Sequence, residues 1–279
     1  MRNFAFVTTL LLVLASSATA QTIDRIKETQ QIKLGYRVDA PPLSFLDSQN
    51  LPAGYSPMIC SELAKEIATV LKIDDLNVEY VPVDTKNRFD KVANGEIDLL
   101  CGAATITLER RKLVDFSIPT YVDGSSVILP RDGAKSMTEL DGKTVGMRSE
   151  TTTEQAVKNS FESAGLEARM ERFNNHKNGI NALVSGQIDA YFADMSILLA
   201  YYVSDNLSNR FRLLDDILTI EKHGLALKRG DSEFRLLVDT GLSKMYARGT
   251  MQRAFKSVLP GADPGVALRA LYMISPTLP

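Results

Sequence analysis

The chain of 279 residues contains no tryptophan, only two histidines and only two cysteines. Because histidine and cysteine are scarce, no cluster has the spacing of a metal site, and there is no signature of a serine or cysteine nucleophile. Positive charge is not in excess either: 32 Lys and Arg residues stand against 34 Asp and Glu residues, and no basic block stands out. We therefore expect no metal, no cofactor and no nucleic-acid partner.

The one long apolar run lies at the N-terminus. Arg2 gives a positive start, residues 4–14 are almost wholly apolar, and Ala18-Thr19-Ala20 has the A-x-A form of a signal-peptidase site. A membrane anchor is the alternative, but the run is short for a permanent transmembrane helix. No cysteine stands at the cleavage point, which disfavours a lipid anchor. We expect residues 1–20 to be a signal peptide and the mature chain to start near Gln21.

Cys60 and Cys101 lie in a chain that such a signal would send to an oxidising compartment. They could form a disulfide, or they could be two buried thiols. Spacing along the chain does not tell whether two cysteines meet in space, so both alternatives remain open.

Short β-rich runs alternate with helical stretches, which favours an α/β fold. Ser56 reads as a helix N-cap with Pro57 at the first helical position, and Ile59, Leu63 and Ile67 form an apolar stripe behind them. The expected strands are residues 32–36, 78–83, 97–100, 144–147, 168–173, 211–214 and 224–227. The expected helices are residues 56–72, 87–94, 151–164, 232–249 and 250–258.

One helix–glycine–strand unit, residues 89–98, is echoed by residues 180–189, which are 91 positions further on. Each half also shows strand, helix and strand in the same order, so we expect two lobes built on one plan. The chain would cross between them near 128–131 and 218–222, a two-segment hinge. This gives a first lobe of residues 21–129 plus 222–279 and a second of residues 130–221.

Ligands of open parallel sheets bind beyond the carboxyl ends of the strands. The polar residues at those ends suit a zwitterion, whose carboxylate binds a guanidinium and free backbone N–H groups and whose ammonium group needs a carboxylate. Further cations imply a second negative charge on the ligand. The candidate ligand-binding residues are Arg37, Thr85, Arg88, Thr105, Arg110, Thr151, Thr152, His176 and Asp194.

Four runs carry a resemblance to a known family: residues 102–110, 114–117, 140–146 and 186–190. Together they resemble the polar amino-acid solute-binding proteins of bacterial ABC importers over roughly residues 32–256, and the glutamate/aspartate-binding members most. The resemblance implies a periplasmic binding protein of type II, with two α/β lobes on a two-segment hinge. It also implies a monomer in the periplasm that captures an amino acid without catalysis and delivers it to a membrane permease.

The resemblance also implies a role for each site residue. Arg110 would bind the α-carboxylate of the ligand, helped by the Thr105 hydroxyl and by backbone N–H groups near Thr151 and Thr152. Asp194 would receive the α-ammonium group. The residues implied to surround the side-chain carboxylate are Arg37, Thr85, Arg88 and His176.

Three positions depart from the family pattern. Glu150 stands where the family usually has glycine, so its carboxylate would repel an anion unless it turns outward or pairs with Arg148. His223 replaces a usual tyrosine, and we expect it to be structural. Ala103 replaces a frequent serine and loses a hydroxyl.

Other interpretations remain open. Arg37 could be a surface charge, His176 an ordinary loop residue, and Asp194 a helix N-cap. A secreted enzyme similar to cyclohexadienyl dehydratase would use the same fold and an anion-lined cleft. A sensory input domain is a third possibility, since the chain could present its ligand to a separate receptor.

Overall fold

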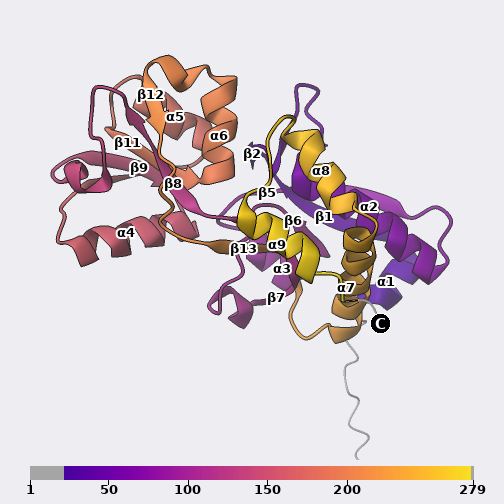
Figure 1. Cartoon of the computed structure of the whole chain (residues 1–279). Helices are drawn as coiled ribbons and strands as arrows, with labels where there is room; N and C mark the ends of the chain where they lie inside the picture. The colour runs from indigo at the N-terminus through magenta and orange to yellow at the C-terminus, as the bar shows by residue number, and fades with distance from the viewer. Residues whose placement is uncertain (1–21, 278–279) are drawn as a thin grey trace, which may run out of the picture.

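In the computed structural model, which describes residues 22–277, the chain forms two α/β lobes side by side (Figure 1). The predicted signal peptide lies outside the described residues. The sheet of lobe 1 has the order β5-β1-β6-β13-β7. Its strands are β1 (Gln31–Arg37), β5 (Asn77–Val83), β6 (Leu99–Cys101), β7 (Val114–Asp123) and β13 (Glu221–Lys228). A small sheet beside it contains β2 (Asp39–Ala40), β3 (Ser44–Leu46) and β4 (Pro52–Ala53).

The sheet of lobe 2 has the order β10-β9-β11-β8-β12. Its strands are β8 (Ser125–Pro130), β9 (Thr144–Arg148), β10 (Arg169–Phe173), β11 (Ala190–Asp194) and β12 (Phe211–Leu213). The helices of lobe 1 are α1 (Thr22–Thr29), α2 (Tyr55–Leu71), α3 (Arg88–Ala93), α7 (Ser232–Ala247), α8 (Thr250–Val258) and α9 (Val266–Ile274). Those of lobe 2 are α4 (Thr152–Ala164), α5 (His176–Val184) and α6 (Met195–Ser204).

The two sheets confirm the repeat predicted from the sequence. In each lobe the first long parallel strand, β1 or β9, lies between a strand on its outer side and the strand of the repeated unit, β6 or β11. Gly95 and Gly186 end the preceding helical segments with φ angles of 73° and 77°, which glycine adopts without strain. An antiparallel strand, β13 or β8, then pairs with the repeated unit.

The chain changes lobes between β7 and β8, at Gly124. A Cβ atom at this glycine would lie 2.1 Å from the Thr219 carbonyl oxygen, so the two crossing segments touch there. The prediction that the first crossing lies at 128–131 is wrong, because residues 125–130 already pair with β11 and β12 in lobe 2. The sequence from 114 to 130 is one extended β-rich run, and only its glycine marks the crossing. The second crossing, between β12 and β13, overlaps the predicted 218–222.

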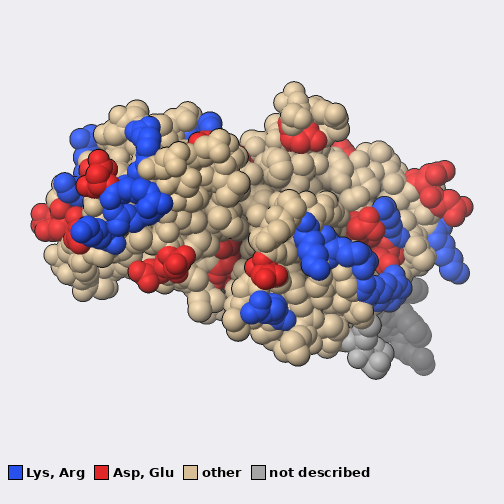
Figure 2. All heavy atoms as spheres, turned by 45° about the horizontal axis from the view of Figure 1, so that its top comes forward, with Lys and Arg blue, Asp and Glu red and all other residues tan. Residues whose placement is uncertain are grey.

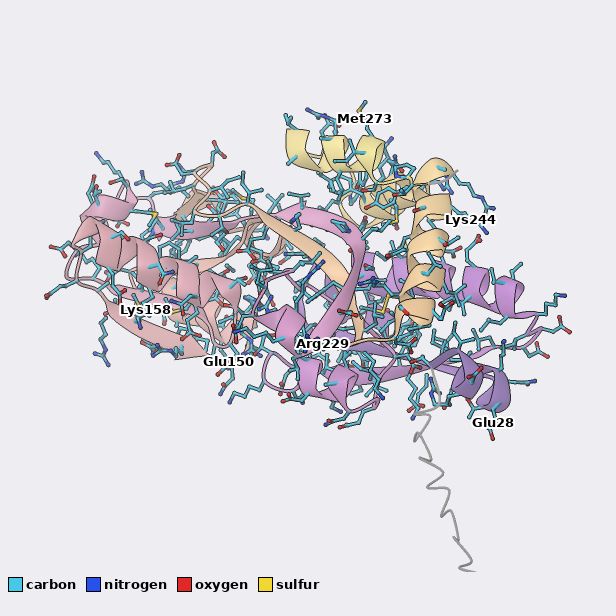
Figure 3. All side chains as sticks on the ribbon, turned by 90° about the horizontal axis from the view of Figure 1, so that it is seen from below. Glu28, Glu150, Lys158, Arg229, Lys244 and Met273 are labelled. Carbon is cyan, nitrogen blue, oxygen red and sulfur yellow. A yellow bond between two sulfur atoms is a disulfide. The ribbon has the colours of Figure 1, made fainter. Side chains whose placement is uncertain are left out.

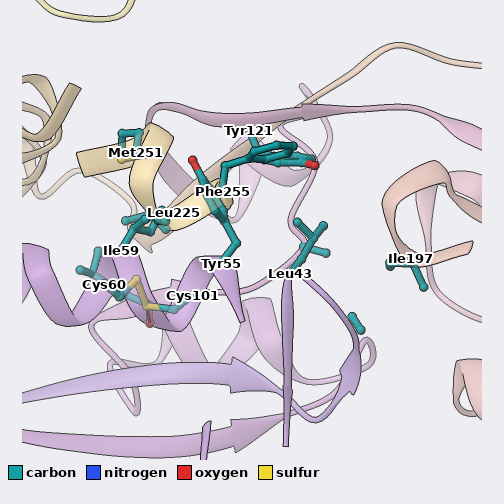
Figure 4. Close-up of a cluster of buried hydrophobic side chains, with 14 of the residues drawn as sticks. Leu43, Tyr55, Ile59, Cys60, Cys101, Tyr121, Ile197, Leu225, Met251 and Phe255 are labelled. Carbon is teal, nitrogen blue, oxygen red and sulfur yellow. Dashed lines mark hydrogen bonds between the residues drawn. A yellow bond between two sulfur atoms is a disulfide. The ribbon is translucent and has the colours of Figure 1, made fainter. Parts of the chain in front are cut away.

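Helix α2 packs on the sheet of lobe 1 through its apolar stripe. Ile59, Leu63 and Ile67 are fully buried, as predicted. The helix starts at Tyr55 behind Gly54, two residues before the predicted Pro57. A disulfide joins Cys60 to Cys101 and therefore ties α2 to β6 inside the core, which settles the alternative left open by the sequence (Figure 4).

Several elements were not predicted from the sequence, among them α1, α9, β7, β8 and the short strands β2, β3 and β4. Helix α9 packs against β7 through Leu268, Leu271 and Tyr272, while Met273 on its other side is exposed (Figure 3). On the face shown in Figure 2, positive and negative side chains are interspersed over both lobes. Within residues 22–277, none of the helices combines the length and apolar character that a membrane crossing requires.

Candidate ligand-binding site

A pocket lies between the lobes at the carboxyl ends of β1, β9 and β11. Both lobes contribute side chains, and the chemistry differs along its length. The lining residues are Arg37, Arg88, Ala103, Thr105 and Arg110 from lobe 1 and Arg148, Thr151, Thr152, Thr153, His176, Phe192, Ala193, Asp194 and Ile197 from lobe 2. Since β13 and β8 carry the crossings and β1 and β9 lie two strands away, we call the end near Thr105 and Thr152 the hinge end. The end near Arg37 and Arg148 is the outer end.

The outer end is held by one carboxylate between two guanidinium groups. Asp39 accepts hydrogen bonds from Nε and Nη2 of Arg37 at 2.8 and 2.5 Å, and from Nε of Arg148 at 3.0 Å. Both arginines are about 97% buried or more. Asp39 belongs to lobe 1 and Arg148 to lobe 2, so this ion pair joins the lobes. Burial raises the pKa of Asp39, but the positive charges of Arg37 and Arg148 outweigh it and bring the pKa to about 2.

His176, the first residue of α5, is also at the outer end. Its Nδ1 lies 3.0 Å from the hydroxyl of Tyr191. Burial lowers the pKa of His176 to about 3, an effect that Asp39 opposes and the two arginines reinforce. The imidazole is therefore neutral at physiological pH and offers a polar contact without charge.

Arg88 and Arg110 lie between the two ends and share one aromatic support. Their guanidinium carbons lie 4.8 and 4.9 Å from the centroid of the Phe89 ring. Each donates to a backbone carbonyl, Arg88 to Ala103 at 2.8 Å and Arg110 to Thr105 at 2.7 Å. In the part of the chain that the structure describes, neither forms an ion pair with a carboxylate, and Nε of Arg88 has no hydrogen-bond partner. These are the two cations of the pocket that a ligand anion can neutralise.

At the hinge end, Glu221 bridges the lobes. Its Oε2 accepts from the Thr105 hydroxyl of lobe 1 at 2.5 Å and from the Thr152 hydroxyl of lobe 2 at 2.6 Å. Burial raises the pKa of Glu221, but hydrogen bonds from Thr105, Thr152 and Thr219 outweigh it, so the pKa lies below its usual value. The carboxylate is therefore ionised.

Asp194 ends β11 beside the hinge end. Its Oδ1 accepts from the Thr153 hydroxyl at 3.3 Å, and its Oδ2 lies 3.8 Å from Nε2 of His223. Burial, followed by the negative charges of Asp123 and Glu221, raises the pKa of Asp194 well above its usual value. A ligand ammonium group would compensate this carboxylate and displace its proton.

Eight of the nine residues predicted from the sequence line the pocket. The exception is Thr85, which is buried but does not line the pocket, and its hydroxyl has no partner in the described part of the chain. The contacts of these residues with a ligand remain predictions. Thr151 serves as the N-cap of α4 and accepts from the Glu154 amide at 3.2 Å.

Sequence reasoning missed Asp39, Arg148 and Glu221, and it gave His223 a structural role only. Arg148 and Asp39 carry the same signal as Arg37, because each follows a strand end or sits just beyond one. Glu221 carried no such signal, since it stands at the start of a strand that returns from the other lobe. His223 is 98% buried, packs on Tyr121 with ring centroids 6.0 Å apart, and burial lowers its pKa to about 4.

Two departures from the family pattern are resolved by geometry. Glu150 is exposed (Figure 3) and is not among the residues that line the pocket, so its carboxylate does not contribute to the anion site. Its φ of 58° explains why glycine suits this position. Ala103 needs no hydroxyl to contribute to the site, because its backbone carbonyl holds Arg88.

Comparison with known proteins extends over both lobes. The sequence profile of the bacterial extracellular solute-binding proteins, family 3, matches residues 32–259. The glutamate/aspartate import solute-binding protein of Salmonella typhimurium is 27% identical over 239 residues, which cover 85% of this chain and 79% of that protein.

Solved structures match over the same region. The ancestral amino acid-binding protein AncCDT-1, a precursor of cyclohexadienyl dehydratase, has a TM-score of 0.75 at 28% identity and covers 85% of this chain and 99% of its own. An ancestral arginine-binding protein bound to glutamine has a TM-score of 0.72 at 28% identity, covering 82% and 97%. The two-lobed architecture is thus shared with amino-acid-binding proteins.

Proposed function

Because the chain belongs to the bacterial extracellular solute-binding proteins, family 3, we propose that it captures an acidic amino acid between its lobes and delivers it to the permease of an ABC importer. The membership confirms the family predicted from the sequence motifs. We place the protein in the periplasm, as the predicted signal peptide and the family both suggest, and expect it to act as a monomer.

The charge of the pocket is the observation that supports an acidic amino acid as the ligand. Four arginines face three carboxylates, those of Asp39, Asp194 and Glu221, while burial keeps both histidines neutral. Once the ligand ammonium group has displaced the proton of Asp194, one positive charge is in excess, and a glutamate or aspartate molecule brings one net negative charge. A neutral amino acid would leave a buried guanidinium without a counter-ion, which is costly.

The ligand groups follow from the free partners in the pocket. Arg110 binds the α-carboxylate, Asp194 binds the α-ammonium group, and Arg88 binds the side-chain carboxylate. Arg110 and Asp194 belong to different lobes, so only the closed arrangement lets one ligand contact both. Charge-assisted hydrogen bonds of about 1.5–3 kcal/mol each support micromolar affinity if the pocket is preorganised.

Calorimetry of the mature protein against an amino-acid panel tests this function. L-Glutamate or L-aspartate is expected to bind at least about tenfold more tightly than L-glutamine, a difference of about 1.4 kcal/mol. Arg88→Ala is expected to remove most of this preference, whereas Arg111→Ala, a matched change at an exposed neighbour of the site, should leave it intact. Equal affinity of the wild type for glutamate and glutamine would reject the acidic assignment and leave the family unaffected.

One observation favours a second candidate, a dehydratase of cyclic acids. A buried carboxyl with a raised pKa, as in Asp194, is the kind of group that serves as a general acid, and the similar AncCDT-1 is named as a precursor of such an enzyme. Incubation with prephenate, followed by ultraviolet detection of an aromatic product, tests it. Turnover that is lost in Asp194→Asn would establish this activity, and no product formation would leave capture as the function.

A further inference from the structure

The hinge end contains an unusual concentration of hydroxyl groups around two carboxylates. Glu221, the first residue of β13, is 95% buried. Its Oε2 accepts from Thr105 and Thr152, whose hydroxyl oxygens lie 3.2 Å from each other. Its Oε1 accepts from Thr219 at 2.7 Å and from Ser125 at 3.2 Å. The carboxylate thus gathers donors from both lobes and from both crossing segments.

The network continues to the second carboxylate. The Ser125 hydroxyl lies 2.8 Å from that of Thr153, and Thr153 donates to Oδ1 of Asp194 at 3.3 Å. Four hydroxyl groups therefore contact Glu221 directly, and two, those of Ser125 and Thr153, connect Glu221 to Asp194.

The chemistry of the groups fixes the direction of these hydrogen bonds. An ionised carboxylate only accepts, and a hydroxyl has a single proton to donate. When Thr105 and Thr152 both donate to Oε2, neither has a proton left for the other or for a ligand. Hydrogen bonds to an ionised acceptor are also stronger than those between neutral groups. The hydroxyl oxygens of these two side chains can therefore only accept hydrogen bonds from a ligand.

The geometry points to Glu221 as a positioning residue that makes Thr105 and Thr152 hydrogen-bond acceptors toward the ligand, so that the hinge end receives the ammonium group. This inference rests on the proposed function only in taking the ligand to be an amino acid. It replaces the role that the family resemblance implied for the Thr105 hydroxyl, which was to help bind the α-carboxylate. That carboxylate is left to Arg110 and to backbone N–H groups at the start of α4.

The same arrangement predicts that tight binding requires an ammonium group on the ligand. Once the ligand ammonium group has displaced the proton of Asp194, Glu221, Asp194 and the two hydroxyl oxygens all present acceptors to the ligand. A ligand without an amino group would direct a carboxylate or a methylene group at unsatisfied lone pairs and at a buried negative charge, both of which cost free energy.

The experiment compares L-glutamate with glutarate, which has both carboxylates but no amino group. Dissociation constants for both are measured by calorimetry on the mature chain in the wild type and in Glu221→Ala. The wild type is expected to prefer L-glutamate by at least about 100-fold. In Glu221→Ala the two threonine hydroxyls are free to donate to a carboxylate, so the preference is expected to fall at least about tenfold.

Two further variants serve as a second test of Glu221 and as a control. Glu221→Gln retains the size of the side chain, but its amide NH₂ group cannot accept, so the two hydroxyls that face this group lose their acceptor and the preference should fall by at least about threefold. This variant decides the question if Glu221→Ala does not fold. Glu150→Gln makes the same change at an exposed carboxylate outside the pocket lining, and its preference should stay within about twofold of the wild type.

A preference for L-glutamate that is unchanged in the folded Glu221 variants would overturn the inference. Equal binding of glutarate and L-glutamate by the wild type would overturn it too. Failure of the proposed function is a separate result, namely L-glutamine binding as tightly as L-glutamate. In that case the experiment is carried out with L-glutamine and its deaminated analogue, 4-carbamoylbutanoate. The ratio of their dissociation constants in the wild type and in the Glu221 variants then tests the inference.

Discussion

The two ends of the pocket join the lobes by different chemistry. At the outer end, Asp39 of lobe 1 pairs with Arg148 of lobe 2, so the contact consists of charges removed from water. At the hinge end, the carboxylate of Glu221 is satisfied by hydroxyl groups from both lobes. A buried ion pair is costly to break on one side, because an uncompensated charge remains. A hydroxyl can instead rotate to a new partner. The outer end is therefore suited to selecting charge, and the hinge end to orienting the group common to all amino acids.

The largest expected effect comes from Arg110, which lies between the ends. We expect Arg110→Ala to weaken the binding of every amino acid by at least about 100-fold, because truncating one partner of a buried, hydrogen-bonded charge pair costs 2–5 kcal/mol or more. Calorimetry with L-glutamate, L-aspartate and L-glutamine measures this. Arg111→Ala is the matched control, since Arg111 is exposed. A loss confined to the acidic ligands would assign Arg110 to the side-chain carboxylate.

At the outer end, Asp39→Ala should strengthen the preference of the pocket for acidic over neutral amino acids. Arg37 would lose the carboxylate that it contacts at 2.5 Å, so the preference for L-glutamate over L-glutamine is expected to rise by about tenfold. Asp39→Asn keeps the shape and should change the preference in the same direction. Asp24→Ala, at an exposed position of α1, controls for net charge.

The same substitution tests closure. With the ion pair between Asp39 and Arg148 removed, the ligand-free protein should have a larger radius of gyration by small-angle scattering and contract when L-glutamate binds. An unchanged radius in both states would show that the hinge end alone holds the lobes together.

The two buried histidines, one near each end, should make the free energy of unfolding depend on pH over different ranges. The unfolded chain binds a proton at each histidine below about pH 6.5, whereas folded His176 stays neutral until about pH 3. Stability is therefore lost as pH falls through that window, by about 1.4 kcal/mol per pH unit for one histidine. The free energy of unfolding, measured by urea denaturation at several pH values, should change with pH more steeply in the wild type than in His176→Asn, by this amount.

For His223, which titrates at about 4 when folded, the corresponding slope should end at a higher pH than for His176. His223→Asn measured under the same conditions gives that comparison. Equal slopes for a variant and the wild type would mean that the histidine concerned is protonated in the folded protein.

The smallest effect is expected at Glu150, outside both ends. Its left-handed backbone disfavours a residue with a Cβ atom, so Glu150→Gly should raise the free energy of unfolding by about 0.5–1 kcal/mol. Glu150→Ala, which keeps the Cβ atom, should give no such gain. Thermal denaturation measures both, and ligand affinity should remain that of the wild type.

Much of the fold could be predicted because local patterns dictate it. The stripe of Ile59, Leu63 and Ile67 requires a helix packed on a sheet, and the glycines at 95 and 186 end helical segments where strands follow. The start of α2 was misplaced because Ser56-Pro57 resembles an N-cap, whereas Gly54 takes the N-cap position with a φ of 110°, which favours glycine. Helix α9 was missed because little beyond its short apolar run distinguishes it from a loop.

The candidate site was predictable where its residues directly follow parallel strands, as Arg37 and Asp194 do. That rule places side chains at the same edge of a sheet but does not tell which of them pair with one another. Asp39 therefore went unnoticed beside Arg37, although the two form a contact two residues apart. Thr85 was included because it follows the predicted strand at 78–83, yet it lies outside the pocket lining.

The sequence by itself determined the α/β fold, the two-lobed plan, the family and most of the pocket residues, because these depend on periodicity and on the order of elements along the chain. Only the tertiary structure decided that Cys60 pairs with Cys101, that the chain crosses at Gly124, and that Asp39 contacts Arg148. It also decided which hydroxyl groups contact Glu221. Each of these depends on the distance between segments far apart in the chain, which the packing of the two lobes sets and no local pattern encodes.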